Sequence, residues 1–242
     1  MAVAARPPLA LRRWLMLPPE EVSEAALRAG AEALIVDFPG SRLSPEHARA
    51  RLAHIARTAA VPLYARLAPS GADGTEADIA AAAEAGLSGV VPAGAGSGAD
   101  VQRLGALLAV AEARASLADG AMTVLPCLDS GAGLLRLASL PGASPRLEAL
   151  LWDGESLARD VGAEAARDPD GRWTGCCSTA RGLVLAAAAA AGVPAIDARF
   201  SGGAGDPFRR EAEAARRDGF RGKVACDAAQ LAALQAVFAT SG

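Results

Sequence analysis

The stretch ALIVDFPGSRLSPEHARARLAHIART, residues 33–58, has the order of a β-strand followed by a helix. Its apolar run Ala33–Asp37 ends at the break Pro39-Gly40. A helix start follows, where Ser44 can cap the first turn and Pro45 fits inside it. Short continuous apolar runs are typical of strands buried on both faces. This stretch therefore predicts one strand–helix unit.

The same order recurs along the chain, with alanine-rich helical stretches between apolar runs. The runs are Trp14–Leu17, Ala33–Asp37, Pro62–Arg66, Gly89–Pro92, Met122–Asp129, Leu147–Asp153, Pro194–Asp197 and Gly222–Cys226. Eight such units in 242 residues predict an α/β fold, a (β/α)8 TIM barrel that forms a single domain over residues 1–242, with an N-terminal tail at residues 1–11. The active site of such a barrel lies at its mouth, where the strands end.

Composition excludes several classes of protein. The net charge is −3, which provides no concentrated basic face for nucleic acid. The longest apolar stretch, Leu183–Ala191, is too short to span a membrane, and no signal peptide is evident, so we expect a cytoplasmic protein. Cys127, Cys176, Cys177 and Cys226 have no zinc-site spacing, and free thiols are favoured over a disulfide or a metal site.

The segment Ala93–Gly98 is rich in glycine and follows a predicted strand. A dinucleotide-binding fingerprint would need the full glycine spacing and a later acidic residue for the ribose, and these are not all present. We therefore favour a flexible loop between strand and helix over a nucleotide site.

Acidic residues stand at several strand ends. Asp37, Asp129, Asp153 and Glu155 should converge on the mouth, with Asp197 opposite. Because like charges repel, a divalent cation such as Mg²⁺ is a natural way to stabilise the set. The alternative for each acid is a helix N-cap, which is the favoured role for Asp227.

Arg66 is the one strand-terminal cation among the eight predicted runs. Its planar guanidinium matches a carboxylate bidentately, which predicts a small anionic substrate. Cys127 lacks a neighbouring histidine to activate it, so we interpret it as a small buried hydrophobe. His47 and His54 share one helix face far from the mouth, where surface or packing roles are favoured over catalysis.

Several motifs together resemble the citrate lyase beta-chain and malyl-CoA lyase family, which is grouped with the HpcH/HpaI aldolases. The resemblance runs from about Arg12 to Phe238. The motifs are Arg13-Trp-Leu-Met-Leu-Pro18, Ala29-Gly-Ala-Glu-Ala-Leu-Ile-Val-Asp37, Tyr64-Ala-Arg66, Leu125-Pro-Cys-Leu-Asp-Ser-Gly-Ala-Gly133, Gly154-Glu-Ser-Leu-Ala-Arg-Asp-Val-Gly162, Ala191-Gly-Val-Pro-Ala-Ile-Asp197 and Gly219-Phe-Arg-Gly-Lys-Val-Ala-Cys-Asp-Ala-Ala-Gln230.

The resemblance implies Mg²⁺-dependent, reversible carbon–carbon cleavage of a small hydroxy acid or 3-hydroxyacyl-CoA, or the reverse aldol-type condensation. It assigns Arg66 and Asp129 as catalytic residues, and Arg66, Asp129 and Asp37 as binding the keto acid. The metal would take Asp129 together with Ser156 and Glu155, and would stabilise the developing enolate. The resemblance also implies a homo-oligomer.

The chain departs from the family pattern at several loops. Asp129 stands where a glutamate is expected, and Ser156 where an aspartate is expected. The family's acids after the second strand, its lysine after the fourth and its Ile-His-Pro after the eighth are replaced by Phe38-Pro-Gly40, Ala93 and Cys226-Asp-Ala228. Two hypotheses follow: a divergent lyase, or a catalytically decayed barrel (a pseudoenzyme) retained as an interaction or regulatory subunit.

Overall fold

A computed structural model describes residues 10–69 and 71–239 of the chain. Each predicted apolar run overlaps a strand, and the fifth overlaps two. The strands are β1 (Arg13–Leu17), β2 (Ala33–Asp37), β3 (Leu63–Leu67), β4 (Gly89–Pro92), β5 (Thr123–Val124), β6 (Cys127–Leu128), β7 (Leu150–Trp152), β8 (Ala195–Asp197) and β9 (Gly222–Ala225). Most of the tail predicted at residues 1–11 lies outside the described residues.

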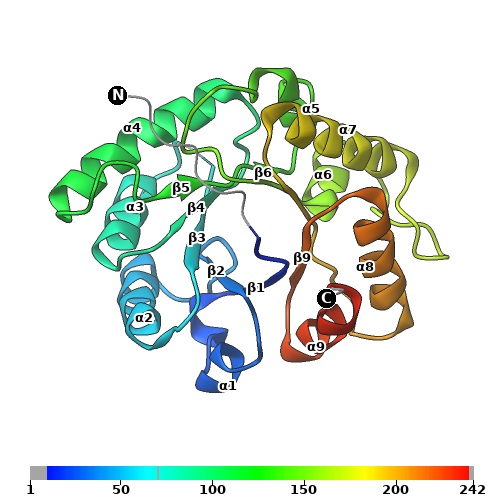
Figure 1. Cartoon of the computed structure of the whole chain (residues 1–242), viewed down its shortest axis with the longest axis horizontal. Coiled ribbons are helices and arrows are strands. Elements are labelled where there is room, and N and C mark those ends of the chain that lie inside the picture. Colours follow the sequence, from blue (N-terminus) through cyan, green and yellow to red (C-terminus); the bar gives the residue numbers. More distant parts are fainter. Residues whose placement is uncertain (1–9, 70, 240–242) are drawn as a thin grey trace.

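All strand pairs are parallel, in the order β5-β4-β3-β2-β1-β9-β8-β7-β6. The two ends of this order are the halves of one predicted strand, interrupted at Pro126, which has no N–H to donate. The N–H of Leu125 donates to Val90 O at 2.9 Å, and the N–H of Leu151 donates to Pro126 O at 3.1 Å. The interrupted strand thus joins both neighbours, and the predicted single-domain barrel is confirmed (Figure 1).

Helices form the outer ring around the strands (Figure 1). They are α1 (Glu24–Leu27), α2 (Pro45–Thr58), α3 (Thr75–Glu84), α4 (Gly98–Arg114), α5 (Gly131–Leu134), α6 (Gly154–Asp160), α7 (Gly175–Ala191), α8 (Asp206–Asp218) and α9 (Ala228–Val237), with 3-10 turns at Pro19–Glu21 and Leu137–Ser139. The predicted caps are present: the Ser44 hydroxyl accepts from His47 N and the Asp227 carboxylate from Gln230 N. No helix among the described residues is long and apolar enough to cross a membrane.

Buried side chains form two layers. The larger layer packs between the sheet and the helices, and the smaller fills the inside of the barrel. The inner layer consists of Trp14, Met16, Ala33, Ile35, Tyr64, Val91, Leu125, Cys127, Ala149, Leu151, Ile196 and Val224. Because successive side chains of a strand point to opposite faces, this inner set shows which strand-terminal residues point into the mouth.

Candidate active site

The side chains of four residues predicted at the mouth point toward the inside of the barrel. Each follows an inner-layer residue by two positions: Asp37 follows Ile35, Arg66 follows Tyr64, Asp129 follows Cys127 and Asp153 follows Leu151. The alternation of side chains along a strand therefore brings three carboxylates and one guanidinium to the mouth. This is the candidate active site.

Arg66 lies at the centre of this group. Its Nη1 donates to Asp37 Oδ1 at 2.9 Å, and its Nη2 lies 3.9 Å from Asp153 Oδ2. Burial acts to lower the pKa of Arg66, but the sulfur of Cys127 and the carboxylates of Asp37 and Asp153 outweigh it, so the pKa is raised. The guanidinium is permanently charged, and Asp37 fixes its orientation.

Asp129 occupies the rim in a half-buried position. Its carboxylate accepts from the backbone N–H of Gly94, with Oδ1 at 3.0 Å and Oδ2 at 3.2 Å. Burial raises the pKa of Asp129 above its ordinary value, and the nearby charge of Asp153 adds to this, while Gly94 and Arg66 partly oppose it. Burial thus favours the protonated form of Asp129 more than water would.

The glycine-rich segment after β4 positions Asp129. Gly94 has a φ of +67°, a conformation that favours glycine, and it turns its N–H toward the carboxylate. Residues 95–98 are buried, and a Cβ on Gly96 would lie 2.1 Å from the Cα of Gly133. The loop predicted to be flexible is instead closely packed, and its glycines allow the backbones to approach.

Asp153 caps α6 and has several partners. Its Oδ1 accepts from Ser156 N at 3.1 Å, and its Oδ2 accepts from the Ser156 hydroxyl at 2.8 Å. Arg199, which follows β8, brings its Nη2 to 3.5 Å from the same Oδ2. One carboxylate oxygen therefore lies within 4 Å of two guanidinium groups, those of Arg66 and Arg199.

Glu155 turns toward another cation. Its Oε1 accepts from Arg167 Nη1 at 3.0 Å and from the backbone N–H of Ser201 at 3.3 Å. Arg167 also donates to Glu211 at 2.8 Å and lies over the ring of Trp173 at 3.7 Å. Glu155 belongs to this ion-pair network, while the Ser156 hydroxyl donates to Asp153.

The donors at the mouth bear on the predicted metal site. Mg²⁺ prefers carboxylate oxygens that are free to bind it, usually one or two with several waters. The described residues contain no group of three or more His, Cys, Asp or Glu arranged to hold a metal ion. Of the predicted ligands, only Asp129 has a carboxylate outside an ion pair. The donor set in this arrangement does not fit a magnesium site built from Asp129, Ser156 and Glu155.

Asp197 lies on the other face of the sheet from the mouth. It is fully buried, and its carboxylate accepts from Trp152 Nε1 at 2.9 Å, from Lys223 Nζ at 2.8 Å and from Arg181 Nε at 3.4 Å. Burial acts to raise the pKa of Asp197, but Lys223 and Arg181 hold it below its ordinary value. The interpretation of Asp197 as a mouth residue is wrong, because Ile196 holds the inward position on β8.

Cys127 forms part of the floor below the mouth. It is buried in the inner layer, as predicted, and burial raises the pKa of its thiol well above the ordinary value. A protonated thiol without a histidine partner is a poor nucleophile. The side chain therefore supports Arg66 and Asp129 by packing.

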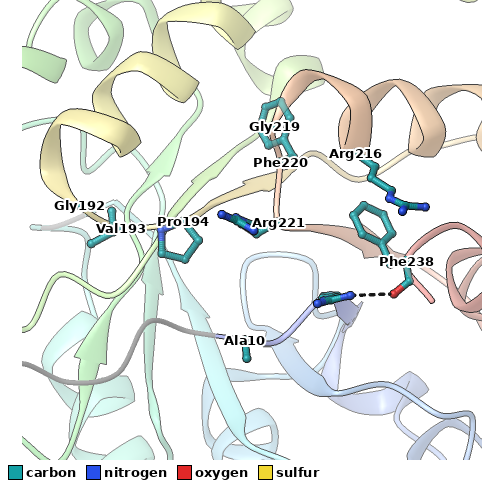
Figure 2. A pocket seen from close by; sticks show the side chains of 10 residues that line it. Ala10, Gly192, Val193, Pro194, Arg216, Gly219, Phe220, Arg221 and Phe238 are labelled. Carbon is teal, nitrogen blue, oxygen red and sulfur yellow. Dashed lines mark hydrogen bonds between the residues drawn. The ribbon is translucent and has the colours of Figure 1, made fainter. Parts of the chain in front are cut away.

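A cavity of about 750 Å³ opens at the opposite end of the barrel, between the starts of β1, β8 and β9 (Figure 2). Arg12, Arg216 and Arg221 line it. The C-termini of α7, α8 and α9 end there, and such termini carry partial negative charge. Arg12 donates to Phe238 O and Arg216 to Val237 O, both at the end of α9. Arg12 and Arg216 therefore neutralise the partial negative charge at the C-terminus of α9. The cavity lies at the other end of the barrel from the candidate site.

Comparison with solved structures gives close matches of fold over nearly the whole chain. RipC from Yersinia pestis is 26% identical, with a TM-score of 0.75, over 96% of this chain and 96% of that chain. The citrate lyase beta subunit from Mycobacterium tuberculosis is 24% identical, with a TM-score of 0.77, over 96% of this chain and 98% of that chain. The same subunit complexed with oxaloacetate and magnesium is 23% identical, with a TM-score of 0.76.

No protein-family model matches the chain, and no curated protein does either. The comparison with known proteins therefore rests on the solved structures. They confirm, for the fold, the resemblance to the citrate lyase beta-chain family that the motifs indicate.

Proposed function

We propose that this chain is a carbon–carbon lyase of the citrate lyase beta-chain type, acting on a small anionic hydroxy acid or its acyl-CoA ester. The observation that carries the proposal is the buried Arg66, oriented by Asp37 and directed to the centre of the mouth. The match of fold to a citrate lyase beta subunit, described in complex with oxaloacetate and magnesium, supports the proposal.

The chemistry follows from the two groups that flank the substrate position. Arg66 binds the carboxylate of the substrate through paired N–H donors. In the cleavage direction a base takes the proton of the substrate hydroxyl, and the carbon–carbon bond breaks to leave a carbonyl product and an enolate. A proton then returns to the enolate carbon. Asp129 fits the role of proton acceptor and donor, because its pKa is raised and it lies half-buried at the rim of the mouth.

Replacement of Arg66 by Gln tests the carboxylate-binding role. The assay follows release of a 2-oxo acid from a panel of small hydroxy acids and their CoA esters, alongside calorimetric binding of pyruvate. A hydrogen bond to a charged group contributes about 1.5–3 kcal/mol, so the variant should bind pyruvate about ten to a hundred times more weakly. Arg28→Gln, at an exposed pair on α1, is the matched control and should bind like wild type.

Turnover with pyruvate binding unchanged in Arg66→Gln would contradict the assigned role. Absence of both turnover and binding in the wild type would contradict the proposed function. Magnesium binding at Asp129 stays a prediction, and calorimetry of Mg²⁺ with wild type and Asp129→Ala tests it.

The second candidate function is a decayed barrel that serves as an interaction or regulatory subunit. The engagement of Glu155 by Arg167 and the neutral Ser156 favour it, because both remove expected metal ligands. In that case Arg66→Ala should leave the cellular phenotype unchanged, whereas variants at a subunit interface should alter it. A homo-oligomer and a cytoplasmic location are part of both proposals.

A further inference from the structure

Arg199 brings a second guanidinium to the mouth. It follows the buried strand β8, its side chain is 30% exposed, and its Nη2 lies 3.5 Å from Asp153 Oδ2. Arg66 approaches the same oxygen, at 3.9 Å from its Nη2. The two cations therefore converge on one point from different strands of the barrel.

The donors of Arg199 are largely unused. Its Nε is buried and has no hydrogen-bond partner among the described residues, and the pair with Asp153 is longer than a hydrogen bond. A guanidinium has five N–H donors and no acceptor. A buried N–H without a partner costs free energy, so a shift of this partly exposed side chain that brings the N–H to an acceptor is favourable.

The other charged groups around the mouth have closer partners. Asp37 pairs with Arg66 at 2.9 Å, Asp129 accepts from Gly94, and Glu155 pairs with Arg167 at 3.0 Å. Two guanidinium groups within 4 Å of Asp153 also oppose the approach of a divalent cation to that carboxylate, because like charges repel. Asp153 is thus disfavoured as a metal ligand in this arrangement.

We propose that Arg66 and Arg199 together bind a small 2-oxo acid without a divalent cation. Arg66 binds the carboxylate, and Arg199 donates to the 2-oxo oxygen, which is the alkoxide oxygen of the substrate before the carbon–carbon bond breaks and carries negative charge at that stage. This inference rests on the proposed function, because it assigns the cation that would stabilise the alkoxide of the proposed reaction.

Calorimetry with pyruvate tests the inference directly. Wild type is titrated in EDTA and again with excess Mg²⁺, and the two dissociation constants should agree within about threefold. Arg199→Gln should weaken pyruvate binding about ten to a hundred times in both buffers. Arg199→Lys should recover part of the loss. Arg209→Gln, at an exposed pair on α8, is the matched control and should bind like wild type.

Pyruvate binding that disappears in EDTA would overturn the inference, and so would wild-type affinity in Arg199→Gln. Circular dichroism and thermal melting confirm that the variants are folded. Activity separates the two proposals. Turnover that needs Mg²⁺ and does not need Arg199 would retain the proposed function and reject this inference. Metal-free binding that needs Arg199, without turnover of any substrate in the panel, would retain the inference and reject the lyase.

Discussion

Replacing Asp197 with Asn should destabilise the protein strongly and leave the mouth intact. The buried carboxylate accepts from Lys223, Arg181 and Trp152. Removing one partner of a buried ion pair costs about 3–5 kcal/mol, because the other charge stays buried. Lys223 would keep Glu211, and Arg181 would keep Asp218. We therefore expect the free energy of unfolding to fall by about 3 kcal/mol, the lower end of this range.

Urea denaturation and thermal melting measure this loss. For a chain of this size a loss of about 3 kcal/mol lowers Tm by about 6–12 °C. Asp170→Asn is the control, since the side chains of Asp170 and Arg172 are 73% and 78% exposed and such a pair contributes little. A loss of unfolding free energy below about 1 kcal/mol would refute the structural role of Asp197. It would mean that the buried donors of Lys223, Arg181 and Trp152 do not need the negative charge of the carboxylate. Loss of pyruvate binding in a folded variant would return Asp197 to the mouth.

The pH dependence of stability gives a second measure of the same carboxylate. The pKa of Asp197 is lowered in the folded protein, against an unfolded value of about 3.9. Its contribution is therefore fully present above that unfolded value and is lost as the pH falls below it. Stability of the wild type should fall more steeply than that of Asp197→Asn below about pH 4. Parallel acid profiles would contradict the assigned coupling to Lys223 and Arg181.

Two further predictions concern packing and thiol reactivity. Gly96→Ala should lower Tm and weaken pyruvate binding, because its Cβ would lie 2.1 Å from Gly133 Cα in the loop that holds Asp129. The control is Gly182→Ala on α7, which has open space around it and should be neutral or stabilising. Equal Tm values for the two variants would refute the packing argument. Cys176 is exposed and should react quickly with a disulfide reagent in the folded protein, whereas the buried Cys127 should react only in denaturant; fast labelling of Cys127 would contradict its position in the inner layer.

The barrel could be predicted from sequence because parallel strands buried on both faces are continuous apolar runs. That same property hides which face each side chain takes. Asp153 and Asp197 both end apolar runs, yet one points into the mouth and the other into a buried ion-pair network. A one-residue shift of register moves a side chain to the opposite face, and an all-apolar strand shows no alternation from which to read it.

The buried ion-pair network of Asp197 could have been predicted from the sequence, because one residue in it is a lysine. Lys223 stands inside the apolar run Gly222–Cys226, and a buried lysine needs charged partners, which the structure provides in Asp197 and Glu211. Arg199 had no such signal, since it follows a strand end in a loop rich in glycine and serine. Only the fold places its guanidinium beside Asp153.

The buried network around Asp197 and the charged mouth differ in one physical respect. Lys223 uses all three of its N–H donors, on Asp197, Ala198 O and Glu211, so nothing on it is left for a ligand. At the mouth, by contrast, Arg199 Nε has no partner among the described residues. Apolar replacements for buried charges are often neutral or stabilising. Arg66 also neutralises the buried Asp37, so it would serve the fold of a decayed barrel too, and the pyruvate titrations of Arg66→Gln and Arg199→Gln are what distinguish the two proposals.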